Sequence, residues 1–80
     1  MAYGRLPRVT GVKMIRAFRK AGWIHERTNG DHFIFIHPER PNALVQIQYH
    51  NRDLTTGLIG RIESQSGYTR IEFIDVIRGK

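Results

Sequence analysis

The sequence of 80 residues contains no cysteine and no long apolar run. Without cysteine the chain has no disulfides, no thiolate metal ligands and no thiol nucleophile, and nothing suggests secretion. No segment approaches the roughly 20 apolar residues of a membrane helix, and the first eight residues lack the apolar core of a signal peptide. We therefore expect a cytoplasmic protein that makes no membrane contact.

Acidic residues are also scarce, because seven Asp and Glu stand against 13 Lys and Arg, for a formal net charge of +6. A field of this sign attracts polyanions, either a nucleic acid or an acidic protein. Hydrophobic residues make up 40% of the chain, which is enough for one small core. We expect a single domain, with an extended arm at residues 1–9 and a core at residues 10–80.

A basic helix is predicted at the start of this core. Thr10 can cap its first turn, the helix runs through Ala21, and Gly22 supplies the left-handed residue that follows. One helix face is apolar, and another carries three cations with helical spacing: Lys13, Arg16 and Lys20. We predict that these cations bind phosphates, with a merely solvated face as the alternative.

Strands are predicted at residues 23–27, 32–37 and 43–49, with a hairpin turn at Asn29-Gly30 and a second turn bracketed by Pro38 and Pro41. A weaker helix follows around residues 58–62 and ends at Gly67. The capping-box spacing of residues 69–72 opens a last short helix. The order α-β-β-β-α-α predicts an α+β fold, with a three-stranded antiparallel sheet whose helices pack on one face, as in the double-stranded-RNA-binding domain.

The predicted hairpin places a histidine beside an arginine. With Asn29-Gly30 as the turn, Arg27 lies opposite His32, and His25 shares their face with two isoleucines that become exposed and suit a protein contact, Ile34 and Ile36. Phe33 and Phe35 then face the core, and Trp23 packs as part of it. Such an imidazole can move protons while the guanidinium holds phosphate, although an ordinary exposed histidine is the simpler interpretation.

Three segments resemble a known family: residues 6–11, residues 20–23, and residues 30–38 with the run Gly30-Asp31-His32. In them the chain is similar to the HicA family of mRNA interferases, which cleave RNA and whose fold is similar to the double-stranded-RNA-binding domain. The resemblance covers most of the chain. It implies that His32 is the catalytic residue and that a HicB-like antitoxin is the partner.

The resemblance carries over further positions and also shows departures. Arg27 matches the upstream basic residue of the family, and His50 matches the histidine after the third strand. Asp31 stands where the family has serine, Gln48 where it has proline, and residues 58–61 replace a Thr-Leu-Arg stretch. Asp31 and His50 are therefore possible accessory residues, and Asp31 either steadies an imidazolium or repels phosphate.

Taken together, these features predict a metal-independent endoribonuclease without an organic cofactor. RNA supplies its own 2′-hydroxyl as nucleophile, so a base, an acid and a phosphate-binding cation suffice. The expected partners are RNA and a HicB-like antitoxin, and DNA is not bound by the chain on its own. Two alternatives stay open: a non-catalytic RNA-binding module of the same fold, and a basic domain that binds an acidic protein.

Overall fold

The computed structural model describes residues 6–79, so the first five residues of the predicted arm lie outside the described range. The elements are α1 (Gly11–Lys20), β1 (Ile24–Asn29), β2 (His32–His37), β3 (Arg40–Gln48), α2 (Thr56–Ser66) and α3 (Arg70–Ile77). The α-β-β-β-α-α order is thus confirmed. The third strand begins earlier than predicted and contains Pro41, which is tolerated because β3 is an edge strand of the β1-β2-β3 sheet.

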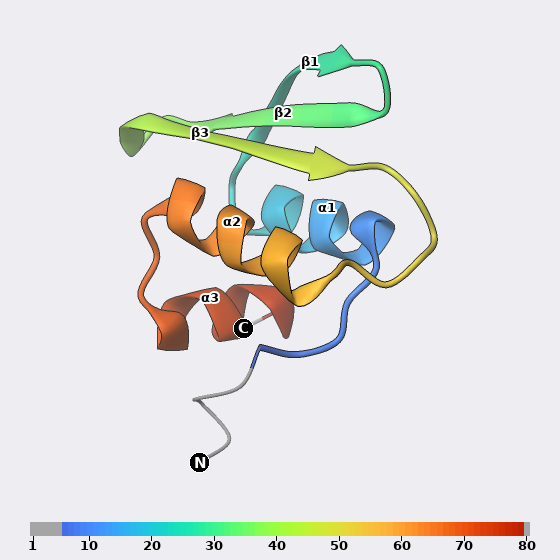
Figure 1. The fold of residues 1–80 in the computed structure, drawn as a ribbon. Coiled ribbons are helices and arrows are strands. Elements are labelled where there is room, and N and C mark those ends of the chain that lie inside the picture. Colours follow the sequence, from blue (N-terminus) through green and yellow to red (C-terminus); the bar gives the residue numbers. More distant parts are fainter. Residues whose placement is uncertain (1–5, 80) are drawn as a thin grey trace.

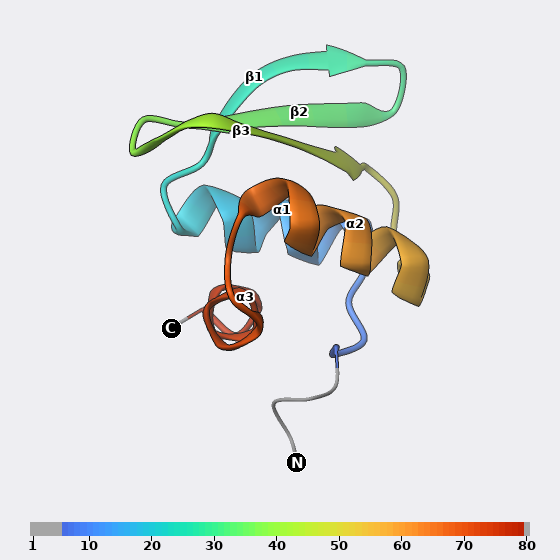
Figure 2. The same cartoon turned by 60° about the vertical axis from the view of Figure 1, so that its left-hand side comes forward.

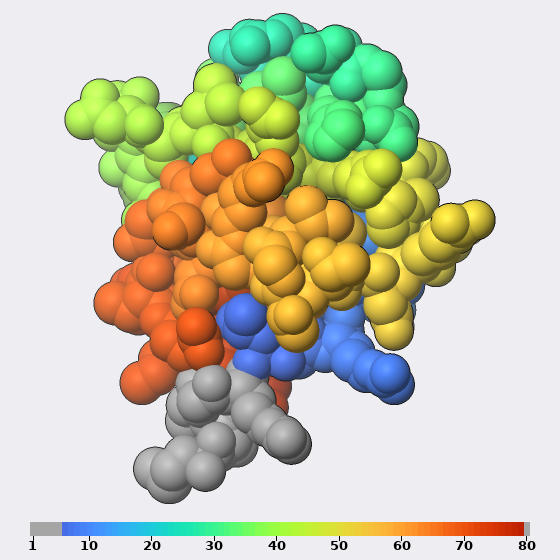
Figure 3. All heavy atoms as spheres, viewed as in Figure 1, coloured from blue at the N-terminus to red at the C-terminus, as the bar shows by residue number. Residues whose placement is uncertain are grey.

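The helices form layers beneath one face of the antiparallel sheet. Figures 1 and 2 show α1 and α2 side by side under the strands, with α3 on the far side of these two helices, and Figure 3 shows atoms of α2 directly against those of the strands on the face in view. Phe18 of α1 lies between the layers, because its ring is near that of Phe73 in α3 and it belongs to the same buried cluster as Phe35 of β2. All three rings are fully buried. One core therefore holds the sheet and all three helices together.

The helix ends follow local signals in the sequence. The hydroxyls of Thr10 and Thr55 accept hydrogen bonds from amides three residues on, at 3.1 Å each. Thr69 and Glu72 form the predicted capping box. Gly22 and Gly67 follow their helices with positive φ angles of 97° and 76°. These backbone conformations favour glycine, so the predicted ends of α1 and α2 are confirmed.

The register of the first hairpin differs from the prediction by one residue. Asn29 pairs with His32, so the two turn residues are Gly30 and Asp31. Gly30 has a φ of 64° and occupies the first central position, where a type II′ turn favours glycine. The expected pairing of Arg27 with His32 was therefore wrong, and Arg27 pairs with Ile34 instead.

A bulge between His25 and Arg27 then exchanges the two faces of β1. His25 pairs with Phe35 and stacks on Phe33 at 4.2 Å, on the face toward the helices. The prediction that His25 shares a face with His32 was wrong. Trp23 is 3% exposed and donates to the Tyr68 hydroxyl at 2.9 Å, so its expected packing role is confirmed.

The sheet face that carries His32 is partly apolar. By strand alternation, Phe33 and Phe35 face the helices, as predicted, and His32 lies on the opposite side. Ile34 shares that opposite side but is only 3% exposed, so its expected exposure was wrong. Ile36 is half-buried. The exposed apolar residues of this face are Ile24, the partner of Ile36, and Leu44.

Candidate active site

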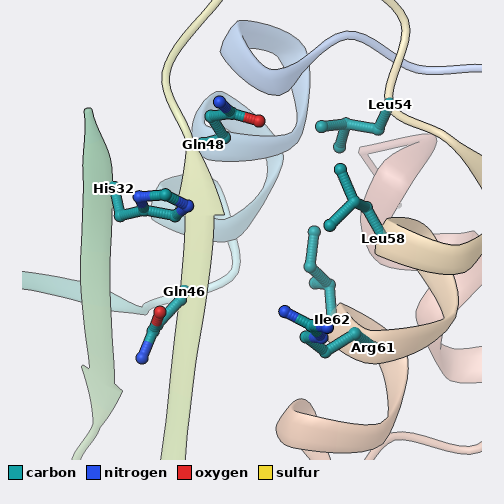
Figure 4. Close-up of a pocket in the computed structure, with 7 residues that line it drawn as sticks. All are labelled: His32, Gln46, Gln48, Leu54, Leu58, Arg61 and Ile62. Carbon is teal, nitrogen blue, oxygen red and sulfur yellow. The ribbon is translucent and has the colours of Figure 1, made fainter. Parts of the chain in front are cut away.

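His32 begins β2, and its ring points across the edge strand β3 into a pocket at this edge of the sheet, whose facing wall is α2. Its side chain is 48% exposed. Figure 4 shows two glutamines of β3 on the same side as His32, and residues of the α2 region on the facing side. The cavity volume of this pocket is about 30 Å³, and its other lining residues are Gln46, Gln48, Leu54, Leu58, Arg61 and Ile62. Solvent can reach the imidazole from its exposed side.

Asp31 contacts the Nδ1 atom of this imidazole. Its Oδ1 atom lies 3.1 Å from Nδ1 of His32. Its Oδ2 atom accepts a hydrogen bond of 3.0 Å from the side-chain amide of Gln48. The hydrogen bond from Gln48 is the largest cause that lowers the pKa of Asp31, and desolvation opposes it. A hydrogen bond from the backbone of Asp31 and the nearby charges of His32 and His50 lower this pKa further. Asp31 is therefore an anion at neutral pH beside His32.

His50 extends the chain of hydrogen-bonded polar side chains that begins with Asp31 and Gln48. Its Nε2 atom lies 3.1 Å from Oε1 of Gln48, and its Nδ1 atom accepts a hydrogen bond of 3.2 Å from the backbone N–H of Arg52. His50 is thus linked to His32 through Gln48 and Asp31. These groups also border a second, more open hollow next to the pocket, in which Arg52 takes part.

Arg61 faces His32 from the other wall of the pocket. Figure 4 shows its guanidinium extending from α2 back toward the strands. Arg61 is exposed, and no carboxylate among residues 6–79 forms an ion pair with it. Sequence reasoning did not select this residue. The signal that could have found it was helical spacing, because Arg61 follows Leu58 by three residues and so shares a helix face with it.

The cations predicted to bind phosphate do not line the pocket. Arg27 lies on the sheet face of His32, two cross-strand pairs further along, and its guanidinium donates a hydrogen bond of 2.6 Å to Glu26. Lys13 and Arg16 are exposed on α1. Lys20 borders a separate hollow at the end of α3. Any contact of the α1 cations with RNA is therefore outside the pocket.

Two further properties concern metals and membranes. Within residues 6–79, no three side chains of His, Asp or Glu gather as a metal site would need. None of the helices formed by these residues has the length and apolar character that crossing a bilayer demands.

A comparison with models of protein families identifies the family of this chain. A family model described as "HicA toxin of bacterial toxin-antitoxin" matches residues 11–68. The chain belongs to the HicA toxin family. The matched range of this HicA toxin runs from α1 to just past α2 and includes both walls of the His32 pocket. A search of the curated proteins finds no match.

Asp31 and Gln48 are two of the positions at which the resemblance described above shows departures, and the structure joins their side chains at 3.0 Å.

Proposed function

We propose that this HicA toxin is an endoribonuclease in which Nε2 of His32 takes the proton of the attacking 2′-hydroxyl. One observation carries the proposal: a half-exposed imidazole, held at Nδ1 by an ionised Asp31, lies across a pocket from the guanidinium of Arg61, which forms no ion pair within residues 6–79. A base within reach and a cation for the developing charge are two of the three groups that RNA transesterification uses, and water can serve as the third, the acid.

The proposed reaction needs no nucleophile from the protein. The 2′-oxygen attacks the adjacent phosphorus as its proton passes to His32, and Arg61 binds the non-bridging oxygens as negative charge builds on them. The bond from phosphorus to the 5′-oxygen breaks, and this oxygen takes a proton from a solvent water. The hydroxide left by that water takes the proton from the His32 imidazolium, which restores the base. The products are a 2′,3′-cyclic phosphate and a 5′-hydroxyl. DNA lacks the 2′-hydroxyl and is not a substrate.

We further propose that a HicB-like antitoxin binds the sheet face that carries His32. Two exposed apolar side chains, Ile24 and Leu44, lie on this face, 49% and 39% exposed. An apolar contact there, together with acidic groups that match the net charge of +6, would cover the pocket. Ile24→Asp should then retain RNA cleavage but escape neutralisation in a co-expression growth assay, and full neutralisation would contradict this surface.

The decisive experiment compares purified wild type with His32→Ala on a structured RNA and on its DNA counterpart. We expect the wild type to release 2′,3′-cyclic phosphate ends from RNA only, and His32→Ala to lose cleavage while it keeps its fold and binds RNA. His25→Gln is the matched control, because it also removes an imidazole but from the opposite face of the sheet. We expect it to cleave normally.

The same assay tests the two alternative functions. If wild type and His32→Ala bind RNA equally and neither cleaves it, the domain is an RNA-binding module. If neither binds RNA at low salt, the basic surface is for a protein partner. Either result would overturn the endoribonuclease proposal.

A further inference from the structure

We propose that Asp31, Gln48 and His50 form a positioning row that fixes the tautomer of His32, with the proton on Nδ1 and the lone pair on Nε2. The effect of this row on cleavage rests on the proposed function. The tautomer itself does not, because it is a property of the unbound protein.

A backbone amide determines which groups of the row donate hydrogen bonds and which accept them. The N–H of Arg52 can only donate, and it bonds Nδ1 of His50 at 3.2 Å. Nδ1 of His50 is therefore an acceptor, so the proton of its neutral ring resides on Nε2. That Nε2–H points at Gln48, 3.1 Å away.

The orientation of the Gln48 amide then determines which of its atoms faces Asp31. Since Nε2 of His50 donates, the atom of Gln48 that faces it must be the carbonyl oxygen, and the amide cannot be flipped without loss of the bond. The NH2 group of Gln48 then faces Oδ2 of Asp31, to which it donates at 3.0 Å. Gln48 thus fixes the position of the carboxylate and lowers its pKa.

The carboxylate of Asp31 in turn determines where the His32 proton lies. An ionised carboxylate only accepts, and its Oδ1 lies 3.1 Å from Nδ1 of His32. A lone pair on Nδ1 would face the lone pairs of this oxygen, so the proton is favoured there. Nε2 keeps its lone pair, and among residues 6–79 no hydrogen-bond donor occupies it. The imidazolium formed when Nε2 takes a proton is stabilised by the same carboxylate.

The test is the ring tautomer of His32, read from 15N chemical shifts at about pH 9, where imidazoles with an ordinary pKa of about 6.5 are neutral. We expect Nδ1–H for His32 and Nε2–H for His50 in the wild type. Gln48→Leu removes the link, and Asp31→Asn removes the charge and forces one bond of the row to reverse. In both variants His32 should shift toward the Nε2–H form. Gln46→Leu, which lines the same pocket but lies outside the row, should keep the wild-type tautomer.

Activity gives a second readout that a purely structural role would not produce. Loss of an orienting partner should lower kcat by about 10- to 100-fold and leave KM nearly unchanged, by analogy with the outer partners of metal-bound histidines. Two results would contradict the proposed row even if RNA is cleaved. One is a proton on Nε2 of His32 in the wild type, and the other is a His32 tautomer that does not change in Gln48→Leu. If the tautomers are as predicted but the protein cleaves no RNA, the proposed row is supported and the endoribonuclease proposal is overturned.

Discussion

Arg61 shows, at the scale of single residues, how a surface cation becomes part of a site. It lies on the helix wall of the pocket, opposite the imidazole, without an ion-pair partner in the described part of the chain. Arg61→Gln should lower kcat by about 10²- to 10³-fold, as loss of a group that stabilises transition-state charge does. The measurement is cleavage of a fixed RNA under single-turnover conditions.

Arg78→Gln is the matched control for this prediction. It removes one exposed arginine at the end of α3 and therefore changes the net charge equally, away from the pocket. If both variants lose the same activity, Arg61 contributes only to the overall field and not to the reaction.

The sequence predicts part of the site at this scale and misses the rest. The contact between Asp31 and His32 joins neighbours in the chain, and its steadying effect was one of the two outcomes expected for Asp31. The pairing of Arg27 with His32 was predicted wrongly because a shift of one residue in a hairpin moves every pairing. Arg61 depends on how α2 packs along β3, which no local pattern encodes.

The start of α1 illustrates, at the scale of elements, how packing positions the site. A Cβ atom at Gly11 would lie 2.0 Å from the backbone oxygen of Gln48. Gly11→Ala should therefore push α1 away from the end of β3 and destabilise the fold by about 1–3 kcal/mol, the usual cost of overpacking. Urea unfolding followed by circular dichroism measures this loss.

Gly60 provides the opposite case within α2. No atom lies within 4 Å of a Cβ built at this position. Gly60→Ala should raise the free energy of unfolding by up to about 1 kcal/mol, because alanine is the better helix former. If Gly11→Ala and Gly60→Ala destabilise the fold equally, close packing at Gly11 is not the cause of the loss in stability.

The capping box of α3 makes stability depend on pH. The amide and hydroxyl of Thr69 bond Glu72 and lower its pKa from the ordinary 4.5, with the nearby charge of Arg40 as a weaker cause and desolvation opposing. A carboxyl with a lowered folded pKa stabilises the protein above its unfolded pKa, and this contribution is lost as the pH falls through the folded value.

Glu72→Gln should therefore be less stable than wild type near neutral pH, and the two proteins should converge in strong acid. Urea midpoints at about pH 7 and about pH 2.5 provide the comparison. A difference that persists unchanged at the lower pH would show that the charge of Glu72 is not involved.

The elements themselves were largely predictable, for a physical reason. Caps such as Thr10 and Thr69 act within one turn of helix, so a few consecutive residues contain the whole signal. The bulge at Glu26 and the early start of β3 depend instead on pairing between strands. Strand alternation alone therefore predicted the faces of β2 correctly, whereas in β1 it placed Arg27 on the correct face and His25 on the wrong one.

At the scale of the whole molecule, the charge of +6 is spread over surfaces with different roles. Lys13, Arg16 and Lys20 lie on α1, whereas the pocket opens between β3 and α2. The triple replacement of these α1 residues by Gln should weaken RNA binding and leave kcat unchanged. The slope of log affinity against log salt should fall by about 0.7–0.9 for each phosphate that the variant no longer neutralises. An unchanged slope would exclude α1 from the RNA-binding surface.

The pocket is built from segments that are far apart in the chain, since His32 and Asp31 belong to the first hairpin and Arg61 to α2. During synthesis the imidazole is complete well before the helix that faces it. A chain released before α2 would carry the histidine without the helix that places Arg61 opposite it. The proposed cleavage of RNA therefore starts only once α2 has been synthesised and has folded against the sheet.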